Sequence, residues 1–273
     1  MIRQIYLFAF LFIFVAAAPE ASAQFLKNSD QIVQSLETAW DKEGGRPLQG
    51  PAEGLAVEKI DESRQNGAKG TEIILQVFYP QGTGNAQVDK AVKEFADEAL
   101  DSYRKDAEEF LNEDQPAPGP GLLSRTFALT QPSPDYISVI FFESTYLGGA
   151  HPSRSYDILS FDLKNGRRLS VDDLFPKGED DEQNRALGFL ANYANAALDH
   201  KCLKNYKDNF CRPNSVTGDS VSHSLRNFAL TPDGLAVVYG PYDQGAYAEG
   251  SKYLDIPKAE LISWGAPDIF WSK

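Results

Sequence analysis

Cysteine, histidine and basic residues are scarce in this chain, and each shortage argues against a class of function. Its 273 residues include two cysteines and three histidines, and 39 acidic residues outnumber 26 basic ones, which gives a net charge of −13. No paired ligand spacing of the zinc type is present, so we expect no metal site and no cofactor. The negative charge argues against nucleic acid as a partner, because phosphate recognition needs a positive surface.

The two cysteines lie close together in the sequence, at Cys202 and Cys211. With no third thiol, two close cysteines in an oxidising compartment predict one disulfide that closes a short loop. A metal site with the nearby His200 and His223 is the alternative, and it lacks the usual ligand spacing.

Long apolar runs are confined to the first 23 residues. Arg3 precedes an apolar run from Ile5 to Ala18, and Ala21-Ser22-Ala23 forms a small-x-small cleavage signal. This arrangement predicts a secretory signal peptide over residues 1–23 and an exported, periplasmic or secreted protein. A membrane anchor is the alternative, but the run is shorter than the roughly 20 residues that a spanning helix needs. We expect no integral membrane span in the mature chain.

Strands outnumber helices in the hydrophobic patterning. Helical periodicity occurs at 29–43, 86–111 and 179–201, and strand patterns occur at 55–60, 71–79, 122–129, 136–146, 155–163, 226–230, 235–239 and 252–256. Hairpin turns join most neighbouring strands and no regular alternation of strand and helix appears, which predicts an α+β fold: a mainly antiparallel sheet with two amphipathic helices, 86–111 and 179–201, packed on it. We expect halves over 24–152 and 153–273 that form one compact unit.

Two glycine-rich segments are the candidate binding sites. The segment from Tyr239 to Tyr253 combines glycines with tyrosines, and its candidate contact residues are Tyr242, Asp243, Tyr247 and Glu249. Tyrosines provide rigid, amphipathic contact area and glycines let another backbone approach closely. The alternative is a crossover that packs its tyrosines on the sheet.

The second segment contains Gly148, Gly149 and His151. Two glycines before a His-Pro pair predict a turn in which the glycines adopt positive φ. His151 is then either a turn residue, a binding residue or a general base.

Three stretches of the chain carry a family resemblance. They are Tyr146 to Pro152 (YLGGAHP), Phe161 to Gly166 (FDLKNG) with Leu174-Phe175, and Phe228 to Leu261, which contains LTPDGL, YGPY and GAYAEG. In this order and spacing they resemble the extracytoplasmic domain pair of RsiV, the lysozyme-responsive anti-sigma factor, and of the peptidoglycan deacetylase PdaC. The resemblance covers roughly Leu55 to Ile262.

The resemblance implies an accessory domain rather than a whole member of either group. We expect this protein to have neither the transmembrane helix and sigma-factor-binding segment of RsiV-like proteins nor the separate metal-dependent deacetylase domain of PdaC-like proteins. What carries over is similar to a lysozyme-binding receptor surface. The family more often has a Glu and a Pro near the turn that reads Tyr242 to Tyr247 here.

Together these features favour a non-enzymatic binding module of the cell envelope. Its partner would be a cell-wall glycan or a cationic, lysozyme-like protein. The alternative is an envelope glycan hydrolase or deacetylase, or its accessory domain, that uses His151 with Asp243 or Glu249, although no nucleophile-elbow pattern surrounds any serine. A third possibility is a structural envelope protein that presents its sheet to another subunit.

Overall fold

The computed structural model describes residues 25–43, 54–66, 71–112, 121–175, 227–243 and 246–272, together with Ala186, Gly188, Leu190 and Tyr193. The predicted signal peptide and the predicted disulfide lie outside these residues. Of the helix predicted over 179–201, the four described residues are all helical.

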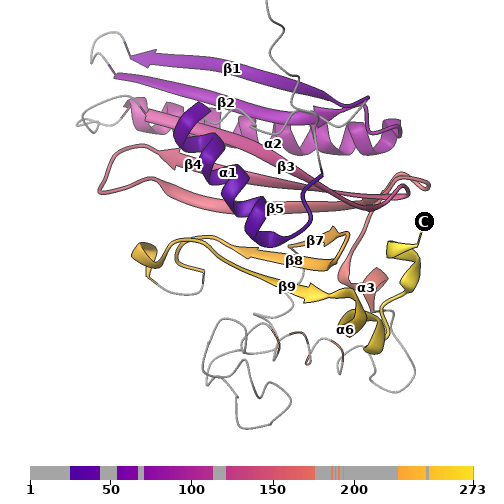
Figure 1. Cartoon of the computed structure of the whole chain (residues 1–273). Coiled ribbons are helices and arrows are strands. Elements are labelled where there is room, and N and C mark those ends of the chain that lie inside the picture. The colour runs from indigo at the N-terminus through magenta and orange to yellow at the C-terminus, as the bar shows by residue number, and fades with distance from the viewer. Residues whose placement is uncertain are drawn as a thin grey trace, which may run out of the picture.

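A six-stranded sheet forms the centre of the described fold (Figure 1). Its strands are β1 (Ala56–Asn66), β2 (Thr71–Gln81), β3 (Gly121–Ser133), β4 (Tyr136–Tyr146), β5 (Ser153–Asp162) and β6 (Arg167–Arg168), paired in that order. All neighbours are antiparallel except β2 and β3, which are parallel. Parallel strands need a long crossover, and a helix lies between these two in the sequence.

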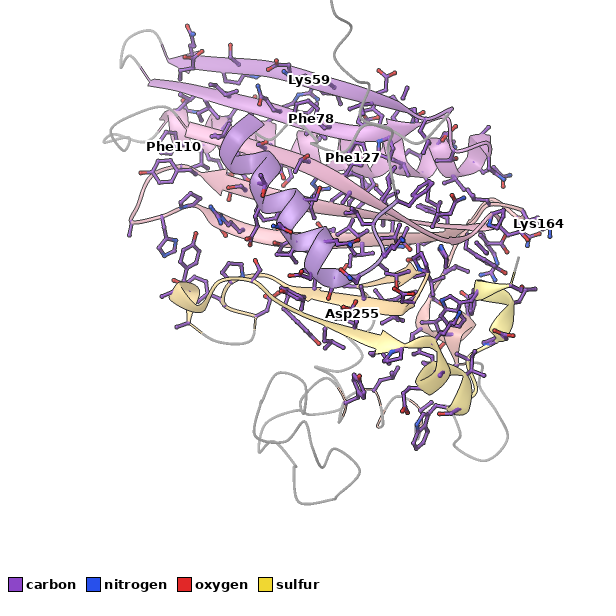
Figure 2. The ribbon with its side chains drawn as sticks, viewed as in Figure 1. Lys59, Phe78, Phe110, Phe127, Lys164 and Asp255 are labelled. Atoms are coloured by element: carbon purple, nitrogen blue, oxygen red, sulfur yellow. The ribbon has the colours of Figure 1, made fainter. Side chains whose placement is uncertain are left out.

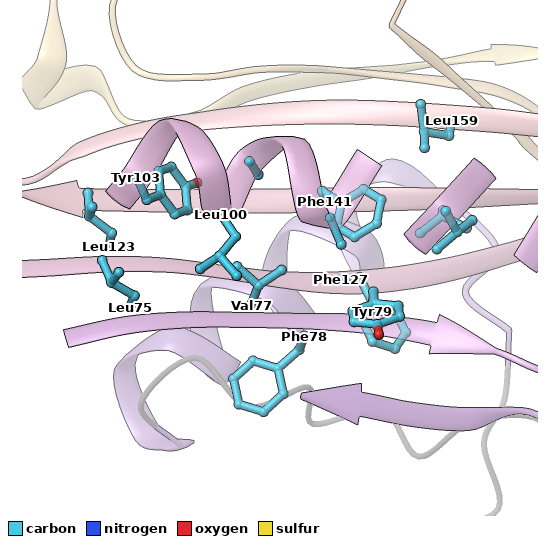
Figure 3. Packing of buried hydrophobic residues seen from close by; sticks show 14 of the residues in the cluster. Leu75, Val77, Phe78, Tyr79, Leu100, Tyr103, Leu123, Phe127, Phe141 and Leu159 are labelled. Atoms are coloured by element: carbon cyan, nitrogen blue, oxygen red, sulfur yellow. The ribbon is translucent and has the colours of Figure 1, made fainter. Parts of the chain in front are cut away.

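That crossover helix, α2 (Ala86–Asn112), packs along one face of the sheet. Its apolar residues recur every three or four positions, so they form one stripe that is buried while the opposite side carries the charges. Figure 3 shows Leu100 and Tyr103 of the helix among Val77, Phe127 and Phe141 of the sheet. These residues belong to the largest buried cluster of the described fold. The predicted helix and its packing on the hairpin sheet are therefore confirmed.

Strand β1 is longer than its hydrophobic pattern indicated. The pattern ended at Ile60, whereas the strand continues to Asn66 and stays paired with β2 throughout. Its added residues are mostly charged or polar because β1 is the edge strand. Charged side chains on an edge discourage pairing with other chains, so the apolar pattern underestimated the strand's length.

The opposite face of the sheet is covered by α1 (Ser29–Glu43) and by a second sheet of β7 (Phe228–Thr231), β8 (Gly234–Tyr239) and β9 (Lys252–Pro257). Ile32 and Leu36 of α1 are buried against both sheets. The start of α1 is fixed to β9, because the carboxylate of Asp255 accepts hydrogen bonds of 2.8 Å from both the amide and the hydroxyl of Ser29. Figure 2 shows Asp255 beneath this end of the helix.

Buried hydroxyls connect the two sheets. Ser138 Oγ accepts a hydrogen bond from the Leu230 amide at 2.9 Å, and Ser160 Oγ donates to the Phe228 carbonyl at 2.8 Å. The two serine hydroxyls lie 2.7 Å apart, and Thr130 Oγ1 donates to the Leu230 carbonyl at 2.6 Å. Side chains thereby provide the hydrogen bonds for the backbone groups at the outer edge of β7, which need partners because they are buried.

The open edge of β5 is satisfied in a similar way. The Asn227 side chain accepts from the Ile158 amide at 2.6 Å and donates to the Tyr156 carbonyl at 2.7 Å. One amide side chain thus replaces a neighbouring strand at the point where β6 has ended. It also brings the start of β7 against β5, which aligns the second sheet with the first.

Short elements cover the far side of the second sheet. They are α3 (Val171–Leu174), α6 (Lys258–Ser263) and a 3-10 turn η2 (Asp268–Trp271). Trp271 is buried here and its indole donates to the Thr231 carbonyl at 2.9 Å. The α+β prediction with a mainly antiparallel sheet is confirmed, and the division of the strands between two sheets is a feature that the sequence did not reveal.

The turn between β5 and β6 provides a test of pH-dependent stability. The buried carboxylate of Asp162 accepts from the backbone amide of Asn165 at 2.9 Å and from its side chain at 2.7 Å. Burial raises the pKa of Asp162, but these hydrogen bonds and the nearby Arg167 outweigh it, so the pKa lies below its ordinary 3.8. The stabilisation is present above pH 3.8 and is lost as the pH falls through the lowered folded-state pKa.

We therefore expect Asp162→Asn to lower the free energy of unfolding by about 1.5 kcal/mol at pH 7, in the range for hydrogen bonds to a charged group. The difference from the wild type should shrink as the pH falls below 4. Urea unfolding at several pH values measures it, with Asp268→Asn as the control because Asp268 is an exposed carboxylate. A difference that does not change with pH would contradict the assigned role of the carboxylate.

Candidate functional site

The turn between β4 and β5 has the backbone that its glycines predicted. Gly148 and Gly149 have φ values of 100° and 107°, in the left-handed region that favours glycine. The Tyr146 hydroxyl donates to the Gly149 carbonyl at 3.2 Å across the turn. His151 follows and is exposed. The turn between β4 and β5 lies at the left end of the sheet in Figure 1.

The connection between β8 and β9 passes beside this turn. It begins at Gly240, where a Cβ would come within 3.0 Å of the Arg154 carbonyl of β5. The absence of a side chain at Gly240 thus permits a close approach of the two backbones. The connection continues through Tyr242 and ends in a 3-10 turn, η1 (Tyr247–Glu249), before β9.

Asp243 holds this connection in shape. Its carboxylate accepts a hydrogen bond from the Gly240 amide at 2.7 Å, and its own amide donates to the Gly240 carbonyl at 3.2 Å. Such a side-chain bond to a nearby backbone amide is a common way for Asp to stabilise a turn. Asp243 therefore positions its neighbours.

Three aromatic side chains meet where the two connections touch. The rings of His151 and Tyr247 are stacked, with centroids 3.6 Å apart and planes 13° from parallel. Tyr242 leans against both, with its centroid 6.0 Å from that of His151 and 5.4 Å from that of Tyr247. We call His151, Tyr242 and Tyr247 the aromatic cluster.

Hydrogen bonds orient the imidazole of the cluster. Its Nδ1 lies 3.1 Å from the Pro152 carbonyl, and its Nε2 lies 3.2 Å from the Tyr242 hydroxyl, across 91 residues of sequence. A carbonyl can only accept, so the tautomer that satisfies both contacts has its hydrogen on Nδ1 and accepts from Tyr242 on Nε2. In this arrangement both ring nitrogens are occupied.

Tyr242 is both exposed and conformationally strained. Its side chain is 65% exposed, and its φ of 78° is the one positive φ among the described residues other than glycine. For a residue with a side chain this conformation costs about 1 kcal/mol or more. Strained residues persist where the surrounding structure holds them, and they gather at functional sites.

The predicted site residues are therefore brought together in part. His151, Tyr242 and Tyr247 are in contact, Gly148 and Gly149 shape the turn beside them, and Asp243 supports the backbone. In the described residues the His151 ring bonds to Tyr242 and Pro152, while Asp243 bonds to Gly240. For Glu249 the structure describes the backbone in η1 and not the side chain. The geometry thus does not provide the His151–Asp243 pair that a hydrolase would use.

A buried arginine with two carboxylate partners lies beneath α2, and the sequence analysis did not single it out. Arg125 is 5% exposed and contacts Glu143 at 2.6 Å and Asp157 at 3.2 Å, while its guanidinium lies 4.7 Å from the centre of the Phe95 ring. Burial raises the pKa of Asp157, and Arg125 opposes this rise. The sequence does show an arginine within the apolar strand pattern at 122–129, which indicates a buried charge. It does not show the partners of this arginine, because they lie on other strands.

These side chains link the sheet to its helix. The hydroxyl of Tyr103 on α2 is buried close to Arg125 and Glu143, and burial raises its pKa. Arginine stacked on aromatic rings and paired with two carboxylates is typical of an internal ion-pair network. We interpret this group as part of the structural core.

The described residues contain neither a cluster of metal-ligand side chains nor a membrane-spanning helix. They contain no group of three or more His, Cys, Asp or Glu side chains arranged to hold a metal ion. Within the same part of the chain, no helix combines the length and apolar composition needed to cross a membrane.

Two parts of the chain match known family models. Residues 68–154 match the family model described as deacetylase PdaC, and residues 172–259 match the family model described as a protein of unknown function, DUF3298. The first includes the turn that carries His151, and the second includes Tyr242 and Tyr247. The cluster is therefore built by residues from both matched regions. No curated protein matches the chain.

Solved structures of the DUF3298 family resemble this one. A family protein of Pseudomonas aeruginosa PAO1 is 17% identical with a TM-score of 0.51, and the match covers 76% of this chain and 93% of that one. A member from Bacteroides fragilis NCTC 9343 is 18% identical with a TM-score of 0.49, covering 79% and 95%. At this identity the first likeness shows a shared fold.

Proposed function

Because the chain carries the PdaC and DUF3298 domain pair that is typical of extracytoplasmic proteins, we propose that it is a non-enzymatic binding module of the cell envelope. Its ligand is a peptidoglycan-related molecule or a cationic protein such as lysozyme. The aromatic cluster is the contact surface. The predicted export and signal peptide belong to this proposal, since both ligands lie outside the cytoplasm.

One observation carries the proposal: an exposed tyrosine is held in a strained conformation beside a stacked His-Tyr pair. Aromatic side chains contribute a large share of the binding energy at recognition surfaces. They also lose little conformational freedom on binding when they are already fixed. A turn selected for stability alone would have glycine at position 242. All other described residues with positive φ are glycines.

The variant Tyr242→Gly tests the proposal directly. Glycine adopts positive φ without strain, so the free energy of unfolding should stay the same or rise. Binding to insoluble peptidoglycan sacculi or to a c-type lysozyme should fall at least tenfold, the loss expected for a contact residue of this type. Cosedimentation measures the first ligand, and titration at two salt concentrations measures the second.

The matched control is Ile269→Ala, which removes another highly exposed apolar side chain, on η2. It should leave binding unchanged. The proposal fails if the wild type binds neither ligand at low salt, or if Tyr242→Gly binds as well as the wild type.

A further inference from the structure

We infer that strand β1 is a dimerisation edge, to which a second copy of this chain adds its own β1 in antiparallel orientation. The two strands are centred on Ile60, so that the six-stranded sheets of two protomers join into one continuous sheet. The open edge of β1, the order of its charges and the residue at the centre carry this inference. It does not depend on the proposed binding function.

The outer edge of β1 is long, regular and exposed. The strand runs from Ala56 to Asn66, and its pairing with β2 proceeds without a register shift. Among the described strands only β2 pairs with it, and none of its residues 56–65 is buried. Figure 1 shows β1 as the outermost described strand of the sheet. Prolines and bulges protect edges from pairing, and β1 contains neither.

The charges of β1 discourage most partner strands, but they match a second copy. Directly opposite residues of an antiparallel pair lie on the same face, so two identical strands related by a two-fold axis pair about one central residue. With Ile60 at the centre, Lys59 lies opposite the partner's Asp61, and this contact occurs twice. Within one chain Lys59 Nζ already contacts Asp61 at 2.5 Å. The four side chains therefore alternate in sign across the junction.

The other face of β1 suits the same register. Ile60 packs partly against the buried cluster beneath α2, and the partner's Ile60 extends this apolar contact. Glu58 lies opposite the partner's Glu62, but each Glu62 is paired with Arg64 at 2.8 Å and with Arg104 of α2. The partner's Arg64 is also the diagonal neighbour of Glu58, within reach of a long side chain.

Neighbouring registers fit less well. Centring the pair on Lys59, Asp61 or Glu62 places two like charges directly opposite each other, which destabilises a strand pair. Centring it on Ser63 avoids this, but the two strands then overlap over a shorter length and Ile60 meets a polar residue. The centre at Ile60 combines a long overlap with matched charges beside the axis.

The aromatic cluster stays open in this dimer. β1 forms one edge of the six-stranded sheet, whereas the turn that carries His151 joins β4 to β5 towards the other edge. Tyr242 and Tyr247 lie on the connection between β8 and β9 of the second sheet. One dimer therefore carries two clusters, and a ligand with repeated binding sites is held by avidity.

Cysteine cross-linking tests the register. In this pair Ile60→Cys places the new cysteine opposite its own copy, at a separation that suits a disulfide. The matched control is Ser63→Cys, an exposed position of the same strand, whose copy lies about 20 Å away along the strand direction. After mild oxidation we expect about tenfold more covalent dimer from Ile60→Cys than from Ser63→Cys. The wild type, which has Cys202 and Cys211 of its own, is oxidised in parallel.

A charge exchange tests the complementarity without added cysteines. Lys59→Glu places a negative charge opposite the partner's Asp61, and Asp61→Lys places a positive charge opposite the partner's Lys59. Each variant should raise the dissociation constant of the dimer about tenfold, because two symmetry-related pairs change from attraction to repulsion. The double variant restores opposite charges and should dimerise like the wild type. Analytical ultracentrifugation over a range of concentrations measures this, with Lys90→Glu on the exposed side of α2 as the control.

Several results would overturn the inference. The wild type could stay monomeric at every concentration, or Ser63→Cys could cross-link as readily as Ile60→Cys. Single charge variants that dimerise like the wild type, or a double variant that dimerises no better than the single ones, would also contradict it. The Tyr242-dependent binding of sacculi or lysozyme is measured separately, so failure of the dimer leaves the proposed function standing.

Discussion

Replacing Arg125 by leucine is expected to lower the free energy of unfolding by about 3 kcal/mol. Removal of one partner from a buried ion pair leaves the other charge without compensation, and this typically costs 3–5 kcal/mol. We expect the lower end of that range because the side chain of Asp157 is 44% exposed and retains contact with water. Glu143, at 21%, is less exposed and carries more of the loss.

The loss should depend on pH. Burial already raises the pKa of Asp157, and Arg125 is the opposite charge that limits the rise. Without Arg125 the folded-state pKa rises further, so the variant loses stability as the pH increases through that value. Urea unfolding at pH 4 and pH 7 should show a smaller difference from the wild type at pH 4.

A matched surface arginine provides the control. Arg104 on α2 also contacts two carboxylates, Glu62 of β1 and Asp101, but its side chain is 36% exposed. Arg104→Leu should cost about 1 kcal/mol or less, as exposed ion pairs do. The triple variant Arg125→Leu, Glu143→Gln, Asp157→Asn should recover part of the loss. Equal effects of Arg125→Leu and Arg104→Leu would contradict the role given to burial.

The variant Thr130→Val is expected to lower the free energy of unfolding by about 2 kcal/mol. Thr130 is fully buried and its hydroxyl donates to the Leu230 carbonyl at 2.6 Å. Valine has the same shape without the hydroxyl, so the carbonyl at the edge of β7 would be left buried and unsatisfied. The usual penalty for such a group is about 1–3 kcal/mol.

Its control lies four residues earlier on the same face of β3. Thr126 is buried, and among the described residues its hydroxyl has no hydrogen-bond partner. Thr126→Val should therefore be neutral or slightly stabilising, because it removes a polar group that burial disfavours. Thr130→Ser, which keeps the hydroxyl, should recover part of the stability. If both valine variants behave alike in thermal unfolding, the hydroxyl of Thr130 does not hold the sheets together.

The local elements of this fold could be predicted from the sequence. The helix over 29–43 was predicted with its observed bounds, and the apolar stripe of α2 correctly identified the face that packs on the sheet. The turn at Gly148 and Gly149 has the positive φ that was expected. These features depend on residues within a few positions of one another, so spacing and glycine placement contain the necessary information.

The arrangement of those elements was decided by tertiary contacts. The separation of β7–β9 into a second sheet depends on side chains such as Thr130, Ser138 and Asn227, which meet the strand edges of distant segments. The parallel pairing of β2 with β3 joins two strands that α2 separates in the sequence. A hydroxyl or amide in a strand pattern does not reveal which backbone group it will satisfy.

The candidate site shows the same division. The sequence singled out His151, Tyr242 and Tyr247, each in its own glycine-rich segment, and assigned Asp243 to the same surface. Only the fold shows that the three rings touch across 91 residues and that the carboxylate of Asp243 is used within its own turn. A contact between distant loops is set by how the two sheets pack, which depends on many weak interactions at once and leaves no mark on either loop's own sequence.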